Sequence, residues 1–265
     1  MLYLISPAKT LDFDTPVDPE LDQRATRPAF VAESAELIGL LRQPSVDQLR
    51  ALMALSEPLA ALNAARYVAW RERFTRHNSR PALLAFAGEV YLGLQARSLS
   101  MPQWGWAQDH LAILSGLHGV LRPLDRLQPY RLEMGTRLAN RHGADLYRFW
   151  GPRLAAELDR RCRGHRHKVL VNLASQEYAR AVDRTALRAR VVDCVFQESD
   201  ADGHHVIGVF AKRARGLMAR HLIEQAADDP QAIDGFAAAG YRFDPQASDA
   251  DRRVFRRPRQ ERLDG

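Results

Sequence analysis

Short runs of apolar residues, separated by segments with helical spacing, constrain the fold of this chain more than any other feature. Leu2–Ile5, Val169–Leu173 and residues 191–196 each have the length of a strand and are too short for a core helix. Further strands are predicted at 82–86 and 206–210. Because strands and helices are interspersed, we expect a mixed α/β protein in which helices flank a central mixed sheet.

The predicted helices are marked by N-terminal capping signals as well as by apolar spacing. Ser45 with Gln48, and Ser100 with Gln103, match the capping box, in which each side chain bonds the backbone N–H of the other residue. A proline two positions after Ser56 favours another helix start there. Helices are expected over 30–41, after Ser45, Ser56 and Ser100, over 145–161 with an interruption at Gly151 and Pro152, and over 211–226.

The composition is that of a globular protein. Of the 265 residues, 46% are hydrophobic and 26% charged, and no window approaches the roughly 20 apolar residues of a membrane span. Two cysteines without a CxxC motif fit a reducing compartment, and no basic region precedes the first apolar run. We therefore expect a cytoplasmic protein with no signal peptide and no membrane partner. No linker divides the chain, which predicts a single domain over 1–265 with a charge-rich, mobile tail at 249–265.

The segment SPAKTLDF, residues 6–13, follows the first predicted strand and places polar groups where α/β proteins often bind ligands. Ser6 and Lys9 match the S-x-x-K pattern of serine acyl-enzymes, but Pro7 follows the serine and neither S-D-N nor K-T-G is present. We interpret Ser6, Lys9 and Thr10 as anion contacts instead. The net charge of +6 also favours a polyanionic partner.

Motifs for cofactors and metals are absent or weak in the sequence. Neither a P-loop nor a G-x-G-x-x-G fingerprint occurs. Cys162, His165 and His167 are metal-ligand types, but the surrounding RRCRGHRHK is crowded with cations that repel a metal ion. The nine histidines show no convincing spacing for direct iron chelation. We predict no cofactor and no metal site.

The segment LSGLHGVLRPLDRLQPYRLEMG, residues 114–135, has two interpretations. Gly116 and Gly119 fit a helix-hairpin-helix type of turn, whose backbone N–H groups bind DNA phosphates, with Arg122 and Arg131 on the same face. The spacing differs by one residue from the usual hairpin. A glycine-containing connection inside the core has about equal weight, so the sequence leaves both interpretations open.

A carboxylate and a phenol follow the predicted strand Val169–Leu173 in VLVNLASQEYARAV, residues 169–182. Asn172 interrupts the strand and needs hydrogen-bond partners there. Ser175 is either part of a site or the cap of the next helix. Glu177 beside Tyr178 would suit general acid–base catalysis if the carboxylate were buried.

Cations are concentrated at the start of the helix predicted in FAKRARGLMARHLIEQ, residues 210–225. Lys212, Arg213 and Arg215 lie in its first turns, where positive charge opposes the helix dipole, and Arg220 follows. This unfavourable placement indicates an anionic partner, although a solvated basic face is the common alternative.

Six segments of the chain together resemble the YaaA family of bacterial peroxide stress proteins. They are ISPAKTLDF, FAGEVYLGLQA, LSGLHGVLRPLDRLQPYRLEMG, LYRFWG, LVNLASQEY and AKRARGLM, and the resemblance extends over residues 1 to about 243. It implies a cytoplasmic protein of the hydrogen peroxide response that limits unincorporated iron and so protects DNA. It also implies a basic cleft and a helix-hairpin-helix-like element similar to those of DNA-binding proteins. The candidate DNA- or anion-binding residues are then Ser6, Lys9, Thr10, Gly116, Gly119, Arg122, Arg131, Lys212, Arg213 and Arg215.

Two functions are compatible with these residues. The first is DNA binding, largely independent of sequence, by phosphate contacts in the cleft. The alternative is an enzyme that acts on a nucleobase or a nucleotide-like small molecule in the same cleft, with Glu177, Tyr178 and Lys9 as candidate catalytic residues. The resemblance implies no catalytic activity. The enzyme hypothesis requires that Glu177 and Lys9 share one pocket.

Overall fold

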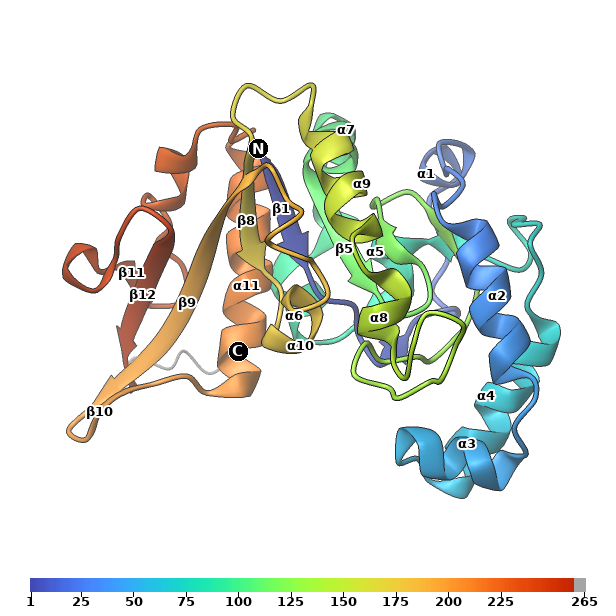
Figure 1. The fold of residues 1–265 in the computed structure, drawn as a ribbon. Coiled ribbons are helices and arrows are strands. Elements are labelled where there is room, and N and C mark those ends of the chain that lie inside the picture. The colour runs from blue at the N-terminus through green and yellow to red at the C-terminus, as the bar shows by residue number, and fades with distance from the viewer. Residues whose placement is uncertain (260–265) are drawn as a thin grey trace.

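The computed structural model describes residues 1–259, which form one mixed α/β domain around an eight-stranded, mostly parallel sheet (Figure 1). The strand order is β11-β12-β9-β8-β1-β5-β6, and β10 pairs with β9. The strands of this sheet are β1 (Leu2–Ile5), β5 (Leu111–Ser115), β6 (Gly119–Leu121), β8 (Val169–Leu173), β9 (Arg190–Asp200), β10 (Gly203–His205), β11 (Arg242–Phe243) and β12 (Arg252–Pro258). Two small sheets pair β2 (Thr10–Leu11) with β4 (Phe86–Ala87), and β3 (Arg80–Pro81) with β7 (Arg126–Leu127). The predicted fold class is confirmed.

The parallel strands determine where a ligand site is expected. Their spatial order is β5-β1-β8-β9-β12, which corresponds to 2-1-3-4-5 in chain order. The order reverses between β1 and β8, so a switch point lies between these two strands. In open α/β sheets, ligands bind in the crevice outside the carboxyl ends of the strands at such a point.

The apolar runs of the sequence form the centre of this sheet. Every residue of β1, β5 and β8 is buried, because neighbouring elements cover both faces of these parallel strands. Strand β9 instead alternates between buried and partly exposed residues from Val191 to Glu198. The strands predicted at Leu2–Ile5, Val169–Leu173 and 191–196 are confirmed.

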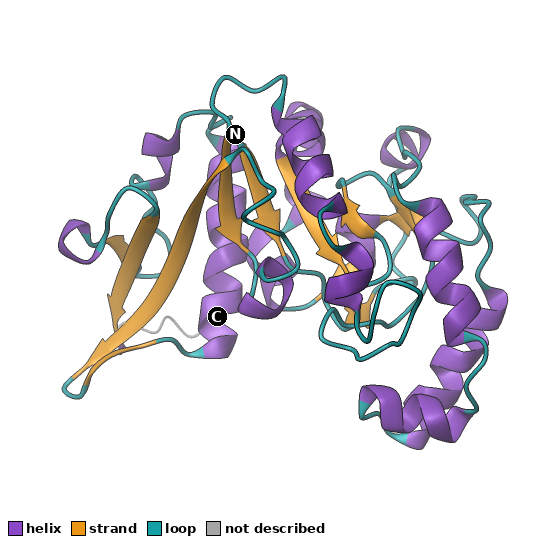
Figure 2. Cartoon of the chain, in the orientation of Figure 1, coloured by secondary structure: helices purple, strands orange, loops and turns teal. Residues whose placement is uncertain are grey.

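Helices surround the sheet and extend beyond it on one side, where α2, α3 and α4 project from the body (Figures 1 and 2). Both predicted capping boxes are present, at the start of α3 and of α7. The predicted interruption at Gly151 and Pro152 separates α8 from α9. The helices are α1 (Pro19–Gln23), α2 (Val31–Leu41), α3 (Val46–Met53), α4 (Glu57–Ala69), α5 (Ala82–Ala85), α6 (Glu89–Leu94), α7 (Met101–His110), α8 (Leu146–Trp150), α9 (Arg153–Cys162), α10 (Gln176–Ala179) and α11 (Gly208–Glu224).

Three local predictions were wrong. Residues 82–86 form helix α5 and only then a short strand, because a compact apolar run does not distinguish a buried helix turn from a strand. Residues 206–210 lead into α11 instead of forming a strand. Arg252–Pro258 is not a mobile tail, since it pairs with β9 along its whole length as β12. Residues 260–265 of that predicted tail lie outside the described residues.

The helix-hairpin-helix-like element is not confirmed at residues 116–119. Strands β5 and β6 flank this turn, and no helix is directly adjacent to it. All four residues are buried, and a Cβ on Gly116 would overlap the carbonyl oxygen of Leu132. The turn is the glycine-containing core connection that was the other interpretation of these glycines.

Close packing between α6 and α11 positions one side of the cavity described below. Gly93 of α6 and Gly216 of α11 lie where the helices cross, and a Cβ on Gly216 would overlap the carbonyl oxygen of Val90. A Cβ on Gly93 would likewise overlap the carbonyl oxygen of Arg213. Glycine allows the two backbones to approach this closely, as no other residue does.

Within residues 1–259, no helix is both long enough and apolar enough to cross a lipid bilayer.

Candidate functional site

A cavity of about 290 Å³ lies at the carboxyl ends of β1 and β8, at the switch point of the sheet. Its walls come from the segment after β1, from α6, from the segment before Gly135, from the segment after β8 and from α11. The polar residues that line it are Ser6, Lys9, Thr10, Glu89, Tyr91, Tyr130, Arg131, Glu133, Ser175, Glu177, Tyr178, Lys212 and Arg215. Segments far apart in the chain therefore meet where the fold predicts a ligand site.

The two serines link the strand ends that border the cavity. The backbone N–H of Ser175 donates to Ser6 Oγ at 2.8 Å, and the two hydroxyl oxygens are 3.2 Å apart. The hydroxyl of Tyr91 donates to the carbonyl oxygen of Ser6 at 3.0 Å. These bonds provide partners for polar groups at the strand ends, and they tie β1, β8 and α6 together around the cavity.

Three tyrosines supply the aromatic part of the cavity wall. Tyr91, Tyr130 and Tyr178 are buried, and burial raises the pKa of each phenol above its ordinary value. The hydroxyl oxygens of Tyr130 and Ser115 lie 2.6 Å apart. All three phenols therefore stay neutral near pH 7, so Tyr178 is a hydrogen-bond donor in this state and not a phenolate base.

One carboxylate neutralises two of the cavity cations. Glu133 lies 3.0 Å from Lys9 Nζ through one oxygen and 2.8 Å from Arg131 Nη2 through the other. Arg213 of α11 faces Glu89 at 3.8 Å and does not line the cavity. The ion pairs with Glu133 therefore hold Lys9 and Arg131 in position and neutralise part of the charge that these two residues could offer to a ligand.

Lys212 and Arg215 differ from these cations, since neither forms an ion pair with any residue in the described part of the chain. Both lie on α11, three positions apart, on the side that faces the cavity. Lys212 is exposed, whereas Nε of Arg215 is buried and has no hydrogen-bond partner among residues 1–259. Burial lowers the pKa of Arg215. A partly buried guanidinium without an ion-pair partner is energetically costly, and an anion in the cavity would offset that cost.

Glu177 lies on α10, two residues after Ser175, and also lines the cavity. Its Oε1 accepts a hydrogen bond from the backbone N–H of Gly135 at 2.9 Å. The hydroxyl of Tyr147 donates to the Glu177 carbonyl oxygen at 3.1 Å. One carboxylate oxygen is thus fixed by the backbone. The other has no hydrogen bond to a described residue, which leaves it able to accept one from a ligand.

The structure brings together most of the residues chosen from sequence, but not all of them. Ser6, Lys9, Thr10, Arg131, Glu177, Tyr178, Lys212 and Arg215 line the same cavity. Arg122 instead pairs with Asp125 at 3.1 Å outside the cavity, and Asn172 donates to Asp193 at 2.7 Å. Gly116 and Gly119 lie in the buried turn.

Sequence reasoning missed Tyr91, Tyr130 and Glu133 as cavity residues. No motif marks them, and each depends on a loop or helix that only the folded chain brings to the switch point. Tyr91 lies in FAGEVYLGLQA, and the other two lie in the segment 114–135. Both segments carry the family resemblance, which was the one signal that could have singled them out.

The fold and the cavity define a mixed α/β protein with a candidate ligand site of mixed charge at its switch point. The chain belongs to the YaaA family: the model of the family described as peroxide stress protein YaaA matches residues 1–247. The chain is similar to UPF0246 proteins from Verminephrobacter eiseniae (58% identical over 257 residues, 97% of this chain and 98% of the relative) and Variovorax paradoxus (57% over 260 residues, 97% and 99%). It is also similar to one from Methylibium petroleiphilum (59% over 257 residues, 97% and 99%).

Proposed function

We propose that this member of the peroxide stress family binds DNA, and that the cavity receives one nucleotide unit of the strand. The observation that carries the proposal is the pair Lys212 and Arg215, two cations without an acidic partner among the described residues, in the same cavity as Lys9 and Arg131. Phosphate oxygens are the natural partners of such cations. The action in the cytoplasm and the limitation of unincorporated iron, both implied by the resemblance, stay predictions.

The size of the cavity decides what part of DNA enters it. Small-molecule sites generally have volumes of roughly 300–1,000 Å³, and the 290 Å³ observed is near the lower limit. A duplex is far too wide to enter, whereas one nucleotide fits. We infer that the phosphate lies against Lys212 and Arg215, and that the base lies toward Glu177 and the tyrosine wall. The buried turn at residues 116–119 makes no contribution to this interface.

A salt titration tests DNA binding. We expect affinity for single-stranded and duplex oligonucleotides to fall steeply with salt. The logarithm of the binding constant should fall by about 0.7 to 0.9 per unit of the logarithm of salt concentration for each phosphate neutralised. Lys212→Gln should reduce the magnitude of the slope by about one, because it removes one phosphate contact. Arg163→Gln is the matched control, since Arg163 is exposed before β8, at the other end of the sheet. A flat salt response in the unsubstituted protein would contradict the proposal.

A second candidate function is catalysis on the bound nucleotide, and one observation favours it. Glu177 shares the cavity with Lys9 and Tyr178. Phosphate binding alone does not require a carboxylate, which repels the DNA backbone. A carboxylate held by the backbone in the same cavity as these cations suits a general acid or base acting on a base or a sugar.

Glu177→Gln separates the two functions. If Glu177 has only an electrostatic effect, the substitution should raise affinity for DNA slightly, by less than about tenfold, and preserve protection of peroxide-stressed cells. If it is an acid or base, the substitution should preserve affinity and abolish protection, with a loss of turnover of about 100-fold or more. Binding isotherms and survival under hydrogen peroxide are the measurements. Full protection at unchanged affinity would exclude the enzyme hypothesis.

A further inference from the structure

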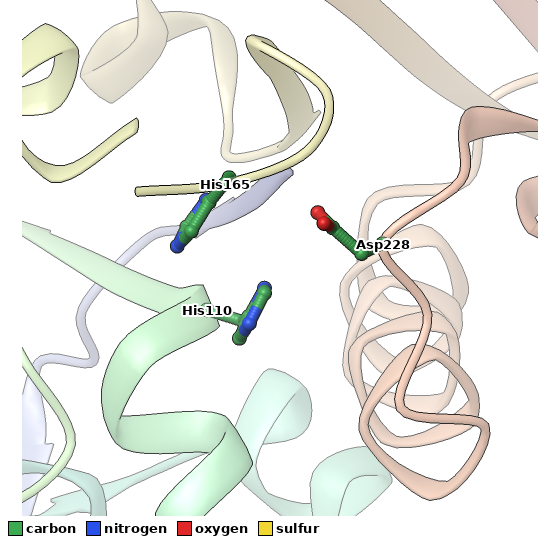
Figure 3. A group of neighbouring side chains, drawn as sticks. All are labelled: His110, His165 and Asp228. Carbon is green, nitrogen blue, oxygen red and sulfur yellow. The ribbon is translucent and has the colours of Figure 1, made fainter. Parts of the chain in front are cut away.

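Two histidines and an aspartate from distant segments meet at the amino end of the parallel strands (Figure 3). His110 is the last residue of α7, His165 lies between α9 and β8, and Asp228 follows α11. One ligand atom from each side chain lies within 4.8 Å of the other two. This cluster is at the end of β1 opposite the cavity, because His110 immediately precedes β5 and Met1 precedes β1.

We propose that His110, His165 and Asp228 form a binding site for a divalent first-row transition metal ion. Two imidazoles and one carboxylate are a donor set that suits Zn²⁺, Fe²⁺ or Co²⁺, and hard cations such as Mg²⁺ and Ca²⁺ prefer all-oxygen sites. Three protein ligands leave further coordination positions open. The site is separate from the proposed DNA-binding cavity and does not depend on it.

The hydrogen bonds of His110 leave a ring nitrogen available to a metal. Its Nδ1 lies 2.8 Å from the carbonyl oxygen of Met1, which can only accept, so Nδ1 carries the proton. Nε2 is then the nitrogen with a free lone pair. A backbone carbonyl bonded to the other nitrogen is the usual support of a metal-ligating histidine, because it fixes both the tautomer and the orientation of the ring.

His165 and Asp228 also offer donor atoms. Nδ1 of His165 is buried and has no hydrogen-bond partner within the described residues. One oxygen of Asp228 accepts from the backbone N–H of Arg166 at 2.9 Å, which ties the carboxylate to the loop that carries His165. The other oxygen pairs with the α-amino group of Met1. A metal ion therefore competes with this amino group for the carboxylate.

Metal binding requires the side chains of the cluster to reorient. Zinc–ligand distances are about 2.0–2.2 Å, so two ligand atoms of a tetrahedral site lie roughly 3.3–3.6 Å apart. Here the donor atoms lie within 4.8 Å of one another. The rings of Trp106, His110 and His165 are stacked, with centroid distances of 3.8 and 4.3 Å. The His165 ring must tilt out of this stack to point a nitrogen at the ion. Its position in a loop, outside any helix or strand, permits that movement.

Metal titration of the full chain tests the site. Apoprotein prepared with a chelator is titrated with Co²⁺ alone, and bound metal is measured by equilibrium dialysis and by the visible absorption of the coordinated ion. We expect one Co²⁺ per chain, displaced by Zn²⁺, and a rise in the melting temperature on binding. His165→Ala and Asp228→Asn should each weaken binding at least tenfold, because each removes one of three ligands.

His77→Ala is the matched control, since His77 is exposed in the loop before β3 and should leave binding unchanged. His165→Ala alters a partly exposed loop residue, so loss of folding does not complicate the result. Binding that persists in both ligand variants would show that surface groups hold the ion, and would overturn the proposal. Absence of a saturable Co²⁺ spectrum in the unsubstituted protein would also overturn it. Neither result would alter the expectation for DNA, because the cavity lies at the other end of the strands.

Discussion

Gly216→Ala is expected to lower the free energy of unfolding by about 3 kcal/mol, one of the two largest effects we predict. A Cβ at this position overlaps the carbonyl oxygen of Val90 and crowds the backbone N–H of Leu94. These atoms belong to the backbone of α6, so no side-chain rotation relieves the overlap. The helices must separate, and the apolar residues packed between them lose contacts.

The same substitution should also disturb the cavity. Tyr91 lies on α6, and Lys212 and Arg215 lie on α11, so separation of the helices widens the space between them. Urea unfolding measures the change in stability, and an oligonucleotide isotherm measures the loss of affinity. Stability and affinity are expected to fall together, because the same helix crossing stabilises the fold and positions the cavity residues.

Gly105→Ala is the matched control for this prediction. Gly105 is an exposed residue of α7, and a Cβ there meets no atom within 4 Å. Because alanine is a better helix former, this substitution should raise the free energy of unfolding by up to about 1 kcal/mol. If Gly216→Ala and Gly105→Ala unfolded at the same urea concentration, the result would contradict the close packing of α6 against α11.

Arg215→Met should change stability and binding in opposite directions. The substitution removes a guanidinium whose Nε is buried without a partner in the described structure, and it retains a long apolar side chain. We expect the free energy of unfolding of the ligand-free protein to rise by about 1 kcal/mol. We expect affinity for DNA to fall roughly tenfold to a hundredfold, because a hydrogen bond to a charged group contributes about 1.5–3 kcal/mol.

Arg220→Met provides the contrast on the same helix. Arg220 pairs with Glu224 at 2.8 Å and donates to the carbonyl oxygen of Leu94 at 3.1 Å, so its charge is satisfied within the protein. Its removal should lower stability and leave DNA affinity unchanged. A loss of stability in Arg215→Met, with unchanged affinity, would show that Arg215 is structural. The two variants are compared by urea unfolding and by titration with the same oligonucleotide.

Local features of this fold could be predicted from sequence because they depend on near neighbours along the chain. The capping boxes at Ser45 and Ser100 formed as predicted, since each needs only a side chain three residues away. The runs at β1 and β8 formed strands because apolar residues, continuous in β1 and broken only by Asn172 in β8, have to be buried on both faces. Where a run was short and unpatterned, as at 82–86, the same reasoning chose the wrong element.

Long-range features depended on the tertiary structure. Lys9, Glu177 and Arg215 were each noticed in sequence, but only the 2-1-3-4-5 order of the parallel strands brings them to one cavity. The cations around His165 argued against a metal site, whereas the fold sets that histidine beside His110 and Asp228. The turn at Gly116 and Gly119 was equally compatible with a DNA contact and a core connection until its burial decided between them. Periodicity and capping act over a few residues, so the sequence alone determined the capped helix starts, the buried strands β1 and β8, and the polar residues that follow these strands. Contacts between segments far apart in the chain depend on how the whole chain packs, and that packing created both candidate sites.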